Sequence, residues 1–231
     1  MDIKIKLLLI ALSLSLFGGL LLLFFAPHTL PITNIRVEEH LVNTNPQALQ
    51  ATLSQVAQGS FFSVDLTAVQ LAVLTLPWVK EAKVQRQWPD TLILKIQERQ
   101  AIARWQAQTL VDKEGHLFTV PQSSVTKSMN LPILSGPVGS AAQVFKHYQF
   151  LSPLVQAVGL QIQKLSLSVR LAWQINLDNG IKLMFGRDDS ELRIRRFLKV
   201  YRRLLKTPKS RPVFVDLRYT NGMAVQMALA E

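Results

Sequence analysis

Cysteine is absent from this 231-residue chain, and histidine is rare. Without cysteine there are no disulfides and no thiolate chemistry, so the folded parts must be held together by apolar packing. The four histidines stand apart, with no i, i+4 pair and no carboxylate spacing typical of zinc enzymes: His28, His40, His116 and His147. We therefore expect no bound metal and no other cofactor.

Acidic residues are also scarce, because 15 Asp and Glu stand against 26 Lys and Arg, a formal net charge of +11 at pH 7. A strongly basic exterior suits anionic lipid headgroups, nucleic acid, cell-wall polymer or an acidic protein partner. Composition alone favours none of these four partners.

Charge of either sign is missing from Leu7 to Ala26, where Leu, Ile and Phe dominate. About 20 helical residues span about 30 Å, which is the thickness of the hydrocarbon core of a bilayer. Signal cleavage needs small residues at two positions, and the sequence Phe24-Phe25-Ala26 does not supply them. We predict a transmembrane helix over residues 7–26 that is retained as an anchor.

The flanking cations predict the topology. Lys4 and Lys6 precede the apolar stretch, whereas the first Lys or Arg after it is Arg36. The positive-inside rule then keeps residues 1–6 in the cytoplasm and exports the remainder, in a bacterium to the periplasm. We expect a single-pass protein of the inner membrane, and a periplasmic location excludes nucleic acid as a partner.

The segment 27–99 predicts the order strand, helix, helix, strand, strand. Pro46 opens one amphipathic pattern, and Asp65 is placed as the N-cap of a second that Pro77 ends. Leu92, Leu94 and Ile96 then alternate with polar neighbours, as in a half-buried strand.

Three phrases in this segment carry a family resemblance: Gly59-Ser60-Phe61-Phe62-Ser63-Val64-Asp65-Leu66, Leu76-Pro77-Trp78-Val79 and Arg86-Gln87-Trp88-Pro89-Asp90-Thr91-Leu92. They resemble the POTRA domain of the FtsQ/DivIB cell-division proteins. A small domain without disulfides needs large apolar groups, so we expect Phe61, Phe62, Trp78 and Trp88 to be core and turn anchors.

Residues 100–231 predict a second domain, mainly antiparallel β with two helices, so the fold class of the whole chain is α+β. Turn residues 112–115 and 178–180 indicate hairpins, and residues 213–227 indicate a closing hairpin. Helices are expected over 140–158 and 188–206. The second of these helices is basic, and its cations are expected on a solvated face: Arg193, Arg196, Lys199, Arg202, Arg203 and Lys206.

Two phrases of the second domain, Leu131-Pro132-Ile133-Leu134-Ser135-Gly136-Pro137 and Val215-Asp216-Leu217-Arg218-Tyr219, again resemble FtsQ. The resemblance implies a bitopic scaffold of the divisome at the division septum. It implies binding to the coiled-coil proteins FtsB and FtsL, and through them a part in controlling septal peptidoglycan synthesis.

The same resemblance assigns partner binding to Arg170, Arg218, Tyr219 and Asn221, with Asn221 in place of an expected serine. An open strand edge would supply main-chain bonds to a partner strand, and these side chains would supply selectivity. The resemblance also assigns recruitment to the septum to Glu81, Val84 and Arg86 in the POTRA domain, where Val84 equally suits a core position.

Catalytic motifs are few. Ser124-Val125-Thr126-Lys127 matches the S-x-x-K of penicillin-binding enzymes, but the accompanying S-D-N and K-T-G motifs are absent. We therefore expect no enzyme and no small-molecule substrate. Two other functions stay open: a periplasmic POTRA chaperone or receptor for outer-membrane or secreted chains, and binding of polyanions by the basic face from Arg193 to Lys206.

Overall fold

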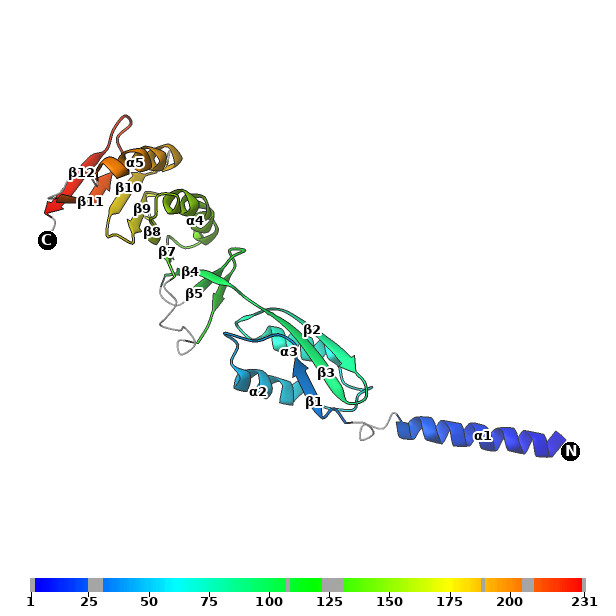
Figure 1. Ribbon diagram of the computed structural model, residues 1–231. Helices are drawn as coiled ribbons and strands as arrows, with labels where there is room; N and C mark the ends of the chain where they lie inside the picture. The colour runs from blue at the N-terminus through cyan, green and yellow to red at the C-terminus, as the bar shows by residue number, and fades with distance from the viewer. Residues whose placement is uncertain are drawn as a thin grey trace. The chain divides into compact units, whose positions relative to one another are not determined.

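The computed structural model of the chain describes residues 3–24, 31–106, 109–121, 131–187, 190–204 and 210–229 (Figure 1). The chain divides into two compact units, Met1–Arg99 and Gln100–Glu231. Ser124 and Lys127 of the S-x-x-K motif lie outside the described residues. Each unit is described by itself below.

The first helix, α1 (Ile3–Phe24), has 22 residues and includes most of the apolar stretch. It begins before Leu7, because Lys4 and Lys6 are good helix formers. Large apolar side chains such as Leu8, Leu16 and Phe17 are exposed. Among the described residues, no helix combines the length and hydropathy that a membrane crossing requires.

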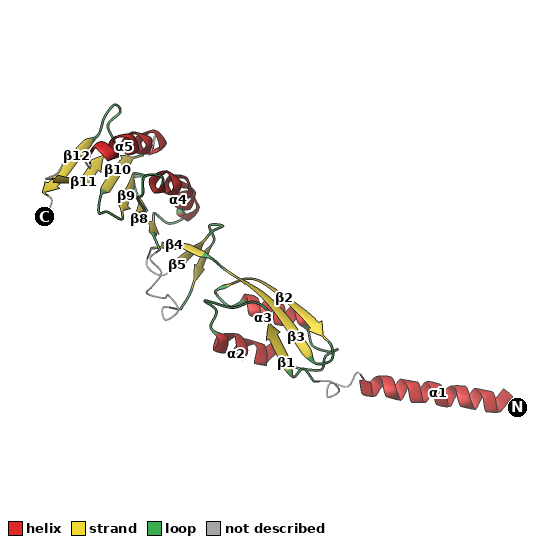
Figure 2. Cartoon of the chain, in the orientation of Figure 1, coloured by secondary structure: helices red, strands yellow, loops and turns green. Residues whose placement is uncertain are grey.

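The rest of the first unit has the predicted order: β1 (Asn34–Val37), α2 (Pro46–Val56), α3 (Leu66–Leu74), β2 (Val79–Gln87) and β3 (Thr91–Glu98). Its sheet has the order β1-β3-β2, in which β1 is parallel and β2 antiparallel to β3. The Asp65 carboxylate accepts bonds from the amides of Thr67 and Ala68, so the predicted N-cap of α3 is confirmed. Figure 2 shows α2 and α3 together on the sheet.

The core of this unit lies between the helices and the sheet, with Val69, Val73, Leu92 and Leu94 fully buried. Of the four aromatic residues expected to be core and turn anchors, Phe61 and Trp78 are buried. Phe62 and Trp88 are 37% and 73% exposed. Both lie in turns, as expected, but their rings are exposed rather than buried.

The second unit contains one nine-stranded sheet with the order β12-β11-β10-β9-β8-β7-β4-β5-β6. The strands are β4 (Ala101–Trp105), β5 (Thr109–Asp112), β6 (Leu117–Thr119), β7 (Ile133–Ser135), β8 (Ile162–Leu167), β9 (Trp173–Leu177), β10 (Lys182–Gly186), β11 (Ser210–Asp216) and β12 (Ala224–Leu229). The helices are α4 (Ala141–Gln156) and α5 (Ser190–Leu204). The α+β class is confirmed.

Strand pairing in this sheet is mainly antiparallel, as predicted, with three parallel pairs that the sequence patterns did not indicate. β7 is parallel to β4 and β8, and β10 is parallel to β11. Two of these pairs are joined by helical crossovers, α4 between β7 and β8 and α5 between β10 and β11. A helix of this length is the usual connection between parallel neighbours.

Helices α4 and α5 pack into the same apolar core as the strands. Val144 and Leu151 of α4, and Ile194 and Phe197 of α5, are fully buried with Ile175 of the sheet. This packing leaves the end strand β12 and the turn before it at the border of the unit, where they carry the candidate site.

Candidate partner-binding surface

Strand β12 is an open edge. It is antiparallel to β11 on one side and comes last in the strand order, and no described strand pairs with its other side (Figure 1). Ala224 and Gln226 are exposed, whereas Val225 packs against the core. An edge of this kind offers unpaired backbone donors and acceptors to an incoming strand. This is the exposed border that the sequence predicted beside Tyr219.

The turn between β11 and β12 begins with a forked ion pair. The Arg218 guanidinium donates to the Asp216 carboxylate, with Nη2 to Oδ2 at 2.6 Å and Nε to Oδ1 at 2.9 Å. The Arg218 backbone amide donates to the same carboxylate at 3.0 Å. Asp216 is buried, and these Arg218 bonds hold the pKa of its carboxyl below the ordinary value. Arg218 is therefore held in one orientation rather than left free for a partner carboxylate.

A second arginine holds the rest of the turn. Arg196, on α5, donates from Nη1 to the carbonyls of Tyr219 and Gly222, each at 3.0 Å. Its Nη2 donates to the carbonyl of Thr220 at 2.6 Å. The prediction of a solvated face on this helix is wrong at Arg196, because its guanidinium donates hydrogen bonds to three carbonyls of the turn.

Arg193, also expected on the solvated face, donates to the Phe185 carbonyl at the end of β10. Gly186 follows with a φ of +78°, and a Cβ there would lie 3.1 Å from the Arg193 Nη1 and 3.3 Å from the Arg218 Cγ. The backbone of Gly186 therefore makes room for both arginines beneath the turn.

Tyr219 and Asn221 are exposed at the tip of this turn, and 58% of Tyr219 is accessible. They border a shallow depression together with Thr220, Gly222, Met223 and Ala224. Because the backbone of the turn is already held, binding costs little additional backbone entropy there, which favours Tyr219 as an anchor.

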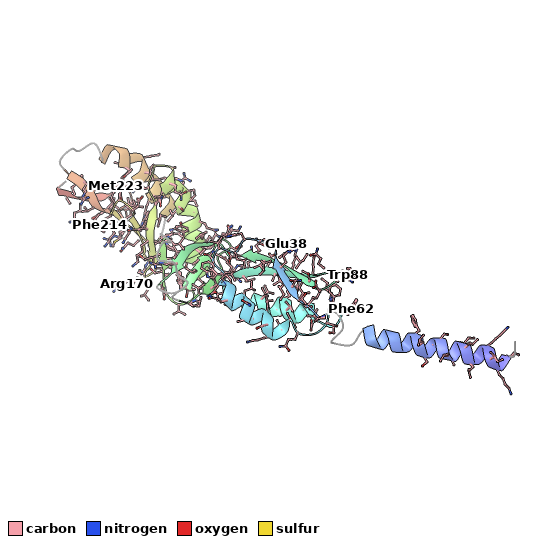
Figure 3. All side chains as sticks on the ribbon, turned by 60° about the horizontal axis from the view of Figure 1, so that its bottom comes forward. Glu38, Phe62, Trp88, Arg170, Phe214 and Met223 are labelled. Atoms are coloured by element: carbon pink, nitrogen blue, oxygen red, sulfur yellow. The ribbon has the colours of Figure 1, made fainter. Side chains whose placement is uncertain are left out.

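Arg170 lies in the turn between β8 and β9, apart from Met223 in the view of Figure 3. Trp173 at the start of β9 is paired with Gly186, and Met184 is paired with Asp216. The beginning of β9 and the ends of β10 and β11 therefore lie at one end of the sheet. Neighbouring strands are about 4.8 Å apart, so β9 and β11 are separated by about 10 Å.

Arg187 occupies the strand end between them, and its Nε donates to the Arg170 carbonyl at 2.8 Å. Arg170 thus lies just before the start of β9, and Arg187 and Arg218 lie just after the ends of β10 and β11, all at the same end of the sheet. Val169 and Leu171 beside Arg170 are also exposed, 88% and 54%. The family resemblance assigned Arg170 and Arg218 to the site, whereas the sequence analysis did not single out Arg187 and placed Arg196 on a solvated face.

The three POTRA residues lie on β2, the other edge strand of the first sheet. Side chains alternate along a strand, so Val84 and Arg86 share a face and Glu81 lies on the opposite one. Val84 is half-buried against the core and Glu81 is exposed. The Arg86 guanidinium donates to the carbonyls of Phe61 at 2.6 Å and Val64 at 2.7 Å, so it supports a turn.

His116 does have carboxylate neighbours, contrary to the expectation from spacing. Asp112, Glu114 and His116 each place one possible ligand atom within 4.8 Å of the others. The Asp112 Oδ1 already accepts bonds from the amides of Glu114 and His116. These bonds form the turn between β5 and β6, which the sequence predicted at 112–115.

Comparison with known proteins assigns the chain to a family. The profile described as "Cell division protein FtsQ/DivIB, C-terminal" matches residues 103–218, and the one described as "POTRA domain, FtsQ-type" matches residues 30–99. The cell division protein FtsQ of Shewanella oneidensis is 39% identical over 212 residues, which cover 90% of this chain and 79% of that protein.

FtsQ of Escherichia coli is 36% identical over 188 residues, or 80% of this chain and 68% of that protein. FtsQ of Coxiella burnetii is 33% identical over 212 residues, or 92% and 86% of the two chains. Two adjoining profile matches and relatives of this coverage agree in one assignment. The chain belongs to the FtsQ/DivIB family of bacterial cell division proteins.

Proposed function

We propose that this protein is a scaffold of the divisome that captures the coiled-coil proteins FtsB and FtsL through β12 and the turn before it. The observation that carries the proposal is an open strand edge next to an exposed Tyr219, on a turn held by Arg196. A partner strand added to β12 would gain main-chain hydrogen bonds. It would also meet Arg170 and Arg187 at the adjacent strand ends, which favours an acidic partner segment, whereas Arg218 is already paired with Asp216 and supports the turn.

In this proposal the protein acts by binding other polypeptides. It catalyses no reaction and takes no small-molecule substrate. Holding FtsB and FtsL at the septum would let it help control septal peptidoglycan synthesis. Glu81 and Val84 on β2 would contact another division protein during recruitment. Arg86 would act there through the Phe61–Val64 turn that its guanidinium supports.

We further propose that residues 7–26 anchor the chain in the inner membrane, with residues 1–6 in the cytoplasm and both units in the periplasm. The proposal is supported by the uncharged sequence of this stretch, by the exposed apolar side chains of α1 and by the position of Lys4 and Lys6.

The experiment that tests partner capture is co-purification of the full chain with FtsB and FtsL, comparing Tyr219→Ala with Phe150→Ala, an exposed aromatic on α4. Truncating an interface anchor costs about 2 kcal/mol, or about 30-fold in affinity. Tyr219→Ala should lose FtsB while Phe150→Ala keeps it. Equal capture by both variants would remove Tyr219 from the site, and capture of unfolded outer-membrane chains instead would favour a chaperone.

A further inference from the structure

Two aromatic side chains that were expected to be core or turn anchors are exposed at one end of the first unit. Trp88 is 73% exposed in the turn between β2 and β3, and Phe62 is 37% exposed in the connection between α2 and α3. Arg86, two residues before Trp88, donates to the Phe61 carbonyl and holds the two turns together. Figure 3 labels Phe62 and Trp88 at the same end of the unit in that view.

The chain enters the unit between these two turns. Pro31 forms an antiparallel bridge with Ser60, next to the Phe62 turn. The Thr33 amide donates to the Asp90 carbonyl at 3.1 Å, two residues after Trp88. The exposed aromatic pair therefore flanks the place where the chain arrives from the apolar stretch. Strand β3 begins at this end and carries the chain to the opposite end of the unit.

The connecting segment is short. Four residues lie between Ala26, the end of the apolar stretch, and Pro31, so the two are five residue steps apart. A chain extends by at most about 3.5 Å per residue, so Pro31 lies within about 17 Å of Ala26. The headgroup layer adds about 5–8 Å on each side of the hydrocarbon core. On the anchor proposed above, this end of the unit cannot move far from the membrane surface.

We propose that Trp88 and Phe62 insert into the interfacial layer of the bilayer and hold the POTRA unit against the membrane. Aromatic rings, and Trp above all, gather at membrane interfaces because one part of the ring is apolar and another is polar. The occupant of this surface is lipid rather than protein, because the short connection keeps the surface at lipid whenever the chain is anchored.

The charges at this end indicate that aromatic insertion, and not attraction to anionic lipid, drives the contact. Asp90 carries a carboxylate here, bonded by the side chains of Asn34 and Thr91. The Arg86 guanidinium is occupied by the Phe61 and Val64 carbonyls. The contact should therefore persist at high salt, where an electrostatic contact weakens.

The test uses the full chain in phosphatidylcholine nanodiscs, with or without bromine near the headgroup end of the acyl chains. Subtracting the spectrum of Trp88→Phe from that of the wild type isolates the Trp88 emission. Trp105→Phe, at a half-buried tryptophan of the other unit, provides the matched control. Bromine quenches only rings that lie in the lipid.

We expect brominated lipid to quench the Trp88 emission at low and high salt alike, and to leave the Trp105 emission unchanged. Trp88 emission that is equal in both lipids would overturn the inference, as would equal quenching of both tryptophans. The proposed anchor is tested separately, since a chain that elutes without the disc would refute the anchor and this inference together. Retention in the disc without quenching of Trp88 would refute the inference alone.

Discussion

Replacing Arg196 by glutamine should weaken partner binding without unfolding the protein. The Arg196 guanidinium donates to three carbonyls of one turn, those of Tyr219, Thr220 and Gly222. Hydrogen bonds from charged groups contribute up to about 3 kcal/mol, but these are partly exposed, so about 0.5–1 kcal/mol each is realistic. The turn would lose about 2 kcal/mol of support.

If the partner binds the turn as it is held now, most of this loss appears in the affinity. A loss of 1.4 kcal/mol is about tenfold, so we expect FtsB to bind Arg196→Gln about 10- to 30-fold more weakly. The melting temperature of the full chain should fall by only about 4–8 °C, because 1 kcal/mol shifts it by about 2–4 °C in a protein of about 200 residues. Calorimetric titration and thermal unfolding of the full chain measure the two quantities.

Arg195→Gln is the matched control, because the Arg195 guanidinium pairs with Glu191 at 3.0 Å on the exposed side of the same helix. Such an i, i+4 pair contributes only about 0.3–0.5 kcal/mol. Arg195→Gln should bind FtsB as the wild type does. Wild-type affinity in Arg196→Gln, or an equal loss in both variants, would refute the reasoning that the turn acts through Arg196.

Three other changes test neighbouring parts of the account. Gly186→Ala introduces a Cβ at a positive φ against Arg193 and Arg218. It should lower the free energy of unfolding of the second unit by about 1–2 kcal/mol, as measured by denaturant unfolding. An unchanged unfolding midpoint would mean that the site relaxes. Asp216→Asn removes the charge that orients Arg218 and should weaken FtsB binding severalfold relative to wild type, as measured by calorimetry. Stronger binding would mean that Asp216 keeps Arg218 from the partner. Burial against the Trp173 ring lowers the pKa of His147 from 6.5 to about 4. Because the unfolded state binds the proton first, stability should be full above about pH 6.5 and fall toward pH 4 by on the order of 3 kcal/mol, and His147→Phe should lose this slope in unfolding curves recorded across that range.

The elements that were predicted correctly depend on local patterns. Asp65 caps α3 through amides two and three residues away, and the 112–115 turn is formed by bonds of the same short range. The order of strands and helices in the first unit follows from such signals. The FtsQ resemblance was carried by phrases of four to eight residues, and both profile matches confirm it.

The features that the sequence did not reveal depend on contacts between distant residues. Arg196 meets carbonyls 23 to 26 residues away, and Arg86 meets carbonyls 22 to 25 residues away. An arginine on an amphipathic helix or edge strand has the same pattern whether it is solvated or bonded to a turn. Trp88 lies in the predicted turn, but the sequence pattern did not indicate that its ring would be exposed.

The central claim is that a partner strand pairs with the open edge of β12, and amide hydrogen exchange along Ala224–Leu229 tests it most directly. The full chain is compared alone and with FtsB and FtsL bound. Pairing predicts that the β12 amides directed away from β11 become protected from exchange on binding, together with those of the turn around Tyr219. Exchange along β12 that is the same in the free and bound protein would contradict the claim.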